Sequence, residues 1–315
     1  NYGCMSNFYF CQSILCGCLA AFPPAHCVFL CFECVWFVYF ADTKPEKAEE
    51  SGCSMKPWFN ENRSFLSKVV IKFLYYITIL LSHTMIGVSQ KIIEQIKYWP
   101  ISKSKIKLIY PAAAMPEFLS KEVARDYFIQ KCHISNVQDA KWFVSLGELH
   151  PIKGHTYALQ AFKLLSEGKP DAKFIYVIIG GGELKEKLQQ EIVNLGLQDN
   201  VFLSDYLENA ATYLKAADYY IFPSLSEAFG YALIEAGQAG VPTLSSYVGG
   251  IPEIVDEDVN GLLFESKSAE SIYEKMGVYL GNPELAESYA EALSAKISKT
   301  FSVEKMVNET LEIYK

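Results

Sequence analysis

Cysteine is scarce over most of the chain. Of the nine cysteines in 315 residues, eight lie before residue 54 and only Cys132 lies beyond it. A structural zinc site needs paired Cys-x-x-Cys units, and Cys31 with Cys34 forms one such unit without a second. The early cysteines stand among Phe, Leu, Val and Trp, so we expect buried free thiols that act as small hydrophobes. A disulfide framework and a metal site stay as the alternatives for Cys4, Cys11, Cys16, Cys18, Cys27, Cys31, Cys34 and Cys53.

Hydrophobic runs long enough to cross a membrane are also missing. Residues 8–22 and 27–41 run for only 15 residues each, whereas a spanning helix needs about 20. No positive region precedes Lys44, so a secretory signal is not predicted. We therefore expect a cytoplasmic protein. Peripheral contact with the inner face of a membrane stays an option, through lysines that otherwise form a solvated face: Lys68, Lys72, Lys91, Lys97, Lys103, Lys105 and Lys107.

A surplus of positive charge is missing as well. The net charge is −8 and the sequence pI is about 5.3, so we expect no nucleic-acid partner. The charge is uneven, because residues 1–112 carry 11 Lys+Arg against 7 Asp+Glu, and residues 113–315 carry 17 against 29. A chain with 50% hydrophobic and 20% charged residues is globular rather than disordered. Its length suits two domains with different chemistry.

Short apolar segments and helical periods alternate from residue 84 onward. This alternation predicts an α/β fold with parallel sheets that are covered by helices on both faces. Ligands of such folds bind beyond the carboxyl ends of the strands. The expected strands are 84–89, 105–110, 141–147, 172–179, 201–203, 218–222, 241–245 and 261–264. The expected helices are 91–98, 156–167, 183–195, 208–217, 232–239, 269–280, 283–298 and 303–314.

The loop after the strand 218–222 carries the strongest chemical signal. Glu227 precedes a helix that opens at residues 229–231, and Glu235 follows inside that helix. A helix N-terminus suits a phosphate, and a carboxylate on either side suits the hydroxyls of two sugars. The pattern indicates a nucleotide-sugar site. A helix cap beside a surface glutamate is the alternative.

Two further strand-end loops carry weaker signals. Lys153, in the loop 147–154, is a compact positive charge that suits a diphosphate. The glycines 180–182 form a tight turn between a strand and a helix. His150 and His155 flank Lys153; we expect both to be solvated loop residues, and contact of either one with a phosphate is the alternative.

Residues 141–264 resemble the nucleotide-sugar domain of the retaining glycosyltransferases of family 4. The motifs that match are Gly147 with 153–154, then 178–182, 217–218, 222–224, 227–235, 239–242, 249–253 and 260–263. The resemblance implies a GT-B fold of two Rossmann-like domains with parallel sheets. It implies that residues 1–112 are part of an acceptor-side domain, which we expect to be truncated. Residues 113–300 would form the donor domain, and 301–315 a closing helix that crosses back.

The resemblance also implies roles for residues. Glu227 and Lys153 would be catalytic, with Glu227 on the sugar hydroxyls and Lys153 on the departing diphosphate. The expected reaction transfers a sugar with retention, from a UDP- or GDP-sugar to a glycan or lipid-linked acceptor, without a metal or other cofactor. The donor-binding residues would be Gly147, Glu148, Lys153, Gly181, Tyr206, Leu207, Glu227, Phe229, Gly230, Tyr231 and Glu235.

Glu148 and Asp205 depart from the family pattern, which has Arg and Gly there. A carboxylate in place of a cation opposes a diphosphate. Two other readings of the chain therefore stay open, a non-catalytic nucleotide-sugar binding module and a GT-B type nucleotide-sugar epimerase.

Overall fold

The computed structural model describes residues 27–30, 69–70, 73, 77, 80–96, 105–135 and 139–314. The first sheet has the order β1 (Cys27–Leu30), β2 (Thr84–Gly87) and β3 (Ile106–Leu108), and both of its pairs are parallel. Helix α3 (Gln90–Ile96) follows β2. The interpretation of the early cysteines as buried thiols, and the runs before residue 54 other than 27–30, lie outside the described residues.

The second sheet has six parallel strands in the order β6-β5-β4-β7-β8-β9. The chain fills the sheet outward from β4 to β6 and then returns to the other side of β4 with β7. The predicted α/β class with parallel sheets is therefore confirmed. The strands are β4 (Lys141–Leu146), β5 (Phe174–Ile179), β6 (Val201–Ser204), β7 (Tyr219–Phe222), β8 (Thr243–Ser246) and β9 (Leu262–Phe264).

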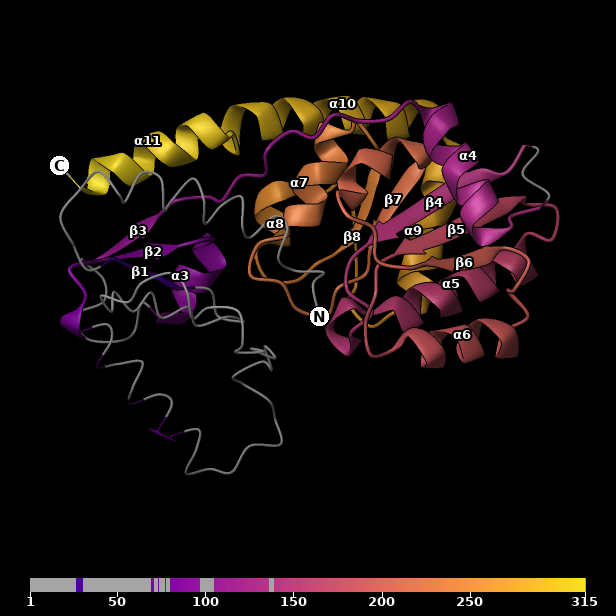
Figure 1. Cartoon of the computed structure of the whole chain (residues 1–315), viewed down its shortest axis with the longest axis horizontal. Helices are drawn as coiled ribbons and strands as arrows, with labels where there is room; N and C mark the ends of the chain where they lie inside the picture. Colours follow the sequence, from indigo (N-terminus) through magenta and orange to yellow (C-terminus); the bar gives the residue numbers. More distant parts are fainter. Residues whose placement is uncertain are drawn as a thin grey trace, which may run out of the picture.

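Helices cover both faces of the six-stranded sheet (Figure 1). Alternate residues of β4 point to opposite faces, so that Trp142 and Val144 join one core and Phe143 joins the other. The core of Phe143 includes side chains of α5 (His155–Gly168), α6 (Lys185–Asn194) and α9 (Ala269–Gly281). The other core includes α4 (Lys121–Cys132), the 3₁₀ helix η3 (Ala210–Ala216), α7 (Tyr231–Gln238), α8 (Ile251–Ile254) and α10 (Pro283–Thr300).

Two elements differ from the sequence-based expectation. Helix α4 was not predicted, because only Ala124 and Phe128 of its 12 residues are buried, which leaves a weak periodic signal. The Ser120 hydroxyl begins the helix by accepting a hydrogen bond from the Val123 amide at 3.4 Å. The helix expected at 208–217 is the 3₁₀ helix η3 rather than an α-helix.

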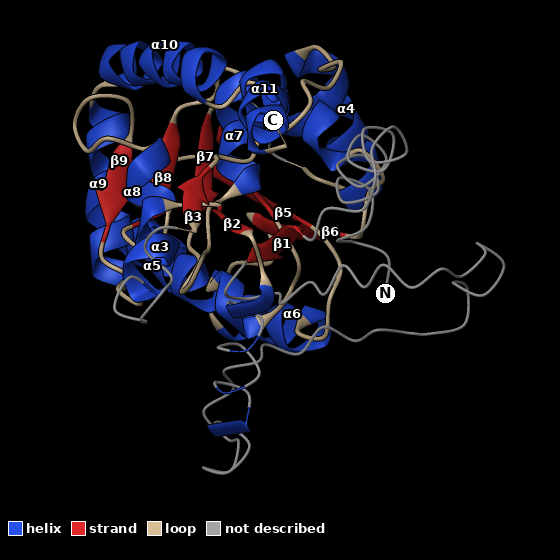
Figure 2. Cartoon of the chain, turned by 90° about the vertical axis from the view of Figure 1, so that its left-hand side faces the viewer, coloured by secondary structure: helices blue, strands red, loops and turns tan. Residues whose placement is uncertain are grey.

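The last two helices run from the second sheet toward the first. Helix α10 lies on the six-stranded sheet, and α11 (Val303–Ile313) continues from it toward β3 (Figures 1 and 2). Phe301, between the two helices, is 1% exposed. In the part of the chain that the structure describes, no helix is both long and apolar enough to cross a bilayer. The domain boundaries at 112 and 300 stay predictions.

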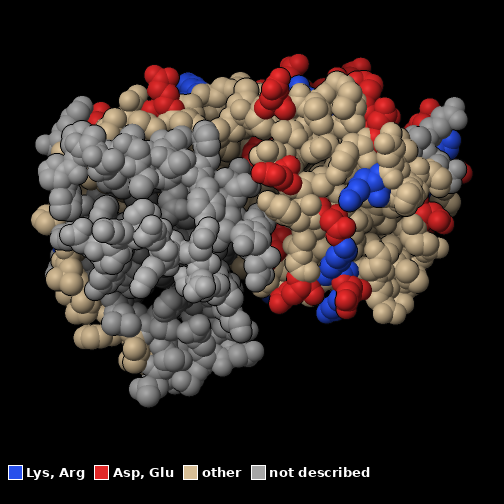
Figure 3. Space-filling model, viewed as in Figure 1, with Lys and Arg blue, Asp and Glu red and all other residues tan. Residues whose placement is uncertain are grey.

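The surface of the six-stranded part is rich in carboxylates. Figure 3 shows many acidic side chains on its visible face, with basic ones between them. This matches the 29 acidic against 17 basic residues of 113–315. A polyanionic ligand must therefore find a local concentration of positive charge.

Candidate functional site

Two loops meet where the strand order of the second sheet reverses. One follows β4 and the other follows β7, and β4 and β7 are neighbours. The Leu225 amide donates to the Ile152 carbonyl at 2.7 Å. Gly154 has φ +66°, and a Cβ there would lie 2.0 Å from the Pro223 carbonyl oxygen. The two loops thus pack backbone against backbone, at the crevice where ligands of open α/β sheets bind.

Lys153 and Glu227 lie in these two loops and contact each other. Lys153 Nζ lies 2.5 Å from Glu227 Oε1, and the two side chains are 24% and 10% exposed. The Ser224 hydroxyl donates to the same carboxylate oxygen at 2.8 Å. Lys153 ends a short 3₁₀ turn, which the His150 imidazole begins by accepting from the Ile152 amide. The structure therefore brings the two predicted catalytic residues into direct contact.

A pair of glycines fixes the backbone at Glu227. Gly249 has φ +52°, and a Cβ there would lie 1.6 Å from the Glu227 carbonyl oxygen. The Gly250 amide donates to that same oxygen at 3.3 Å. Only a residue without a side chain permits this approach. The turn after β8 therefore supports the Glu227 loop from behind.

The loop continues into the N-terminus of α7. Gly230 is the N-cap residue with φ +124°, and among the described residues no side chain caps the helix. Phe229 is buried at 2% exposure, and Tyr231 is 43% exposed. Glu235 is only 4% exposed inside α7. The open helix end and the buried carboxylate lie in the order that the sequence predicted.

Tyr220 lies beneath these carboxylates. Its hydroxyl is hydrogen-bonded to the backbone of Leu146, with 3.3 Å to both the amide nitrogen and the carbonyl oxygen. Burial raises the pKa of Tyr220 well above 10, and the nearby Glu235 and Glu227 carboxylates raise it further. The Tyr220 hydroxyl therefore stays protonated and uncharged, and its hydrogen bonds link β7 to the end of β4.

The remaining predicted donor residues lie around the loops after β4, β5 and β6. A Cβ at Gly180 would lie 1.9 Å from the Gly147 carbonyl oxygen, and a Cβ at Gly181 would lie 3.5 Å from Tyr206 Cβ. Tyr206 is 41% exposed. Glu148 is exposed and Leu207 is partly buried against the core. Asp205 forms an ion pair with Lys185, so the anion that replaces the family's glycine is neutralised locally.

His155 differs from its expected solvated position. It opens α5 with 4% exposure. Burial lowers the pKa of His155 from 6.5 to about 4; a hydrogen bond with the Glu148 backbone offsets part of this shift, and the nearby Lys153 charge adds to it. The imidazole is therefore neutral and packed in the core at physiological pH.

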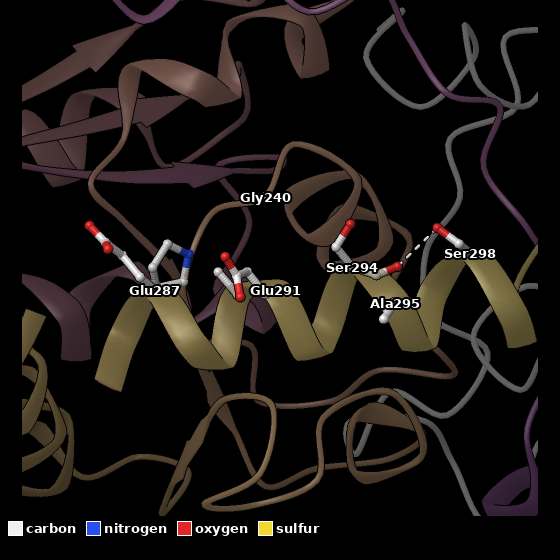
Figure 4. Close-up of a pocket in the computed structure, with 8 residues that line it drawn as sticks. Gly240, Glu287, Glu291, Ser294, Ala295 and Ser298 are labelled. Carbon is white, nitrogen blue, oxygen red and sulfur yellow. Dashed lines mark hydrogen bonds between the residues drawn. The ribbon is translucent and has the colours of Figure 1, made fainter. Parts of the chain in front are cut away.

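Other features lie away from this site. A hollow of about 580 Å³ lies between the turn of Gly240 and Pro242 and the face of α10 from Glu287 to Ser298 (Figure 4). That turn precedes β8, so the hollow is at the amino ends of the strands, opposite the ligand side. Within the described residues, no three His, Cys, Asp or Glu side chains are grouped to hold a metal ion.

Sequence reasoning missed Ser224 and Tyr220 as site residues. The strand-end position of Ser224, three residues before Glu227, is the signal that could have indicated its hydrogen bond. Tyr220 gave no such signal, because a tyrosine inside a buried strand is typical of core packing.

Comparison with known proteins decides the family. Residues 130–295, more than half of the chain, match the family model for glycosyl transferases group 1. The chain belongs to this family. An uncharacterized glycosyltransferase of Methanocaldococcus jannaschii is 27% identical over 246 residues, which are 76% of this chain and 62% of that protein. The D-inositol 3-phosphate glycosyltransferase of Streptomyces scabiei is 26% identical over 230 residues, 70% of this chain and 51% of that protein. This group 1 chain thus spans about half to three fifths of these relatives.

Solved structures show the same fold. Sucrose-phosphate synthase from Thermosynechococcus elongatus has a TM-score of 0.68 at 19% identity, over 81% of this chain and 62% of that one. Anabaena HepE, in complex with UDP and glucose, has a TM-score of 0.66 at 18% identity, over 79% of this chain and 67% of that one. The GT-B fold of this group 1 chain is therefore confirmed. Its assignment to family 4 stays a prediction.

Proposed function

We propose that this chain is a retaining glycosyltransferase that moves a sugar from a nucleoside diphosphate sugar to a glycan or lipid-linked acceptor. The observation that carries the proposal is the contact of Lys153 with Glu227, three residues before the glycine that begins α7. A cation and the amides of a helix N-terminus suit a diphosphate. Glu227 and the buried Glu235 suit hydroxyls, because a carboxylate only accepts hydrogen bonds.

In the proposed reaction, the bond from the sugar C1 to the diphosphate oxygen breaks. A bond from C1 to the acceptor hydroxyl oxygen forms on the same face, and the acceptor proton passes to the departing diphosphate oxygen. Lys153 and the α7 amides stabilise the charge that develops on the leaving diphosphate. We propose that this positive charge replaces a metal ion. Because HepE binds UDP and glucose, a UDP-sugar is the first donor to test.

A lipid-linked acceptor at a membrane surface stays part of the proposal. Of the lysines considered for surface contact, Lys91 and Lys107 are exposed in the described residues. Lys105 instead donates to the carbonyls of Leu80 and Ser82 at 2.9 and 2.7 Å. Its role is therefore structural.

The test is calorimetry with UDP, UDP-glucose, GDP and GDP-mannose in the presence of EDTA, followed by a donor hydrolysis assay. We expect micromolar to millimolar binding of one nucleotide pair, and slow release of sugar with retained configuration. No binding of any nucleotide would overturn the proposal. Binding without hydrolysis or transfer would favour the non-catalytic module, and formation of an epimeric nucleotide sugar would favour the epimerase.

A further inference from the structure

The Glu253 side chain, on α8, forms hydrogen bonds with residues that follow the strands of the first sheet. Its carboxylate accepts hydrogen bonds from the Gln90 amide at 2.8 Å and the Lys91 amide at 3.0 Å. It also accepts a third bond from the Tyr110 hydroxyl at 3.0 Å. Gln90 and Lys91 follow β2 and Tyr110 follows β3. One carboxylate thus joins the ends of two strands of the first sheet to the second sheet.

The Tyr110 ring contacts the loop of the candidate site. It stacks on Phe229 with ring centroids 5.7 Å apart, and it meets Phe301 edge-on at 5.1 Å. Phe229 immediately precedes Gly230, the N-cap of α7. Burial, with the Glu253 hydrogen bond and charge, raises the pKa of Tyr110 to about 12. Tyr110 therefore stays protonated and keeps its bond to Glu253.

The backbone near the Glu253 hydrogen bonds is closely packed. A Cβ at Gly250 would lie 3.0 Å from Ser89 Cβ and 2.6 Å from the Ala228 carbonyl oxygen. Ser89 is fully buried. Gly250 therefore lies between the segment that follows β2 and the loop of Glu227. In Figure 1, α8 lies on the side of the six-stranded part that faces β2 and α3.

We propose that Glu253 is a positioning residue for the transfer reaction, since its three hydrogen bonds fix the first sheet against the loop that holds Glu227 and Gly230. This inference rests on the proposed function. The contact acts through Tyr110 and Phe229 and does not touch the donor. Its loss should therefore lower turnover more than donor affinity.

The test compares Glu253→Gln with the wild type in two measurements. The first is hydrogen exchange of the Gln90 and Lys91 amides, which needs no donor. We expect exchange at least tenfold faster in the variant, because an amide side chain offers one acceptor oxygen where a carboxylate offers two. The second is donor hydrolysis, in which we expect kcat to fall about tenfold while KM for the donor changes less than threefold.

Two further variants separate positioning from general stability. Tyr110→Phe keeps the ring stack but loses the hydroxyl, so its effect on kcat should be smaller than, and non-additive with, that of Glu253→Gln. Glu265→Gln, an exposed glutamate that follows β9, is the matched control and should change neither measurement.

Unchanged exchange at Gln90 and Lys91 in Glu253→Gln would overturn the proposal. So would faster exchange with unchanged kcat, or a kcat loss that is strictly additive with Tyr110→Phe. A wild-type protein that binds and hydrolyses no donor would instead count against the proposed function, and the exchange measurement would still report the contact itself.

Discussion

Lys153 and Glu227 form an ion pair in which both side chains are mostly buried. Replacing Lys153 with Gln leaves the carboxylate with the Ser224 hydroxyl and removes the cation that would face the diphosphate. We expect turnover in donor hydrolysis to fall by about 10² to 10³, the usual loss for a residue that stabilises a developing charge. Lys163→Gln, at a solvent-facing pair on α5, is the control. Equal activity of the two variants would contradict the assigned role.

Glu148 gives a second prediction at this scale. Its exposed carboxylate stands where the family has Arg, so Glu148→Arg exchanges repulsion for attraction. We expect UDP affinity to rise about tenfold at low salt, and the gain to disappear in about 1 M salt, where screening is strong. Glu274→Arg on α9, with the same change in net charge, should leave the affinity unchanged. A gain of equal size in both variants would indicate a long-range effect only.

His155 predicts how stability depends on pH. Its pKa is lowered to about 4 by burial, whereas in the unfolded chain it is about 6.5. Between these values the unfolded state takes up a proton that the folded state does not, so the free energy of unfolding falls as the pH falls from about 6.5 to 4. The loss is of the order of 3 kcal/mol.

The measurement is urea unfolding from pH 7 to pH 4 for the wild type and His155→Leu. The variant should lack this part of the pH dependence, whatever its stability at pH 7. Equal slopes for the two proteins would show that His155 is protonated in the folded state.

The sequence could predict site residues that have suitable chemistry and also lie directly after a predicted strand. Lys153 and Glu227 each follow a predicted strand, so their meeting at one edge of a parallel sheet could be expected. His155 could not be placed in this way, since its burial depends on packing between α5 and its neighbours. The three partners of Glu253 were also hidden, because they lie more than 140 residues away in the sequence.

Some loops and helix starts require a glycine because a side chain at that position would clash with a neighbouring backbone. In Gly154→Ala the new Cβ would lie 2.0 Å from the Pro223 backbone oxygen, so one of the two loops must shift. We expect the unfolding free energy to fall by about 3 kcal/mol or more, which combines backbone strain with the clash. Donor hydrolysis should fall in parallel.

Gly196→Ala is the matched control in the urea measurement. Gly196 has φ +71°, and a Cβ there would have no heavy atom within 4 Å. Only the left-handed conformation is penalised, by about 1 kcal/mol. Equal losses in the two variants would show that the contact between the β4 and β7 loops is not required.

Helices and strands with a clear hydrophobic pattern could be predicted from the sequence. Those stabilised by residues far away in the sequence could not. All six residues of β5 are buried, and a continuous apolar run predicts such a strand. Helix α4 instead depends on Asp218, whose carboxylate pairs with Lys121 and Arg125 at 2.6 and 2.8 Å. Burial favours the neutral form of Asp218, yet these partners and the Trp142 amide lower its pKa overall. No local pattern in the sequence shows this network.

At the scale of the whole molecule, Phe301 joins the two sheets. Its ring contacts Tyr110 and Phe229 with centroid distances of 5.1 and 5.4 Å. Phe301→Ala should lower the free energy of unfolding by about 3–5 kcal/mol and loosen the first sheet against the second. Small-angle scattering should then show a larger radius of gyration for the folded protein.

Phe162→Ala provides the comparison. Phe162 is fully buried in the other core of the six-stranded sheet, so its loss should cost about as much stability without changing the radius of gyration. An unchanged radius in Phe301→Ala would show that other contacts suffice to hold the sheets together. The GT-B arrangement itself could be predicted only through the family motifs, since no periodicity reports how two sheets face each other.

The strand order of the second sheet has a consequence for how the site is acquired during folding. Strands β4, β5 and β6 are consecutive in the chain and adjacent in the sheet, and the same holds for β7, β8 and β9. Each half can therefore form through local contacts, which close quickly. Lys153 belongs to the first half and Glu227 to the second, so the candidate site exists only after the two halves dock along the β4–β7 seam. In refolding experiments, recovery of nucleotide binding should follow this docking step and lag behind the formation of secondary structure.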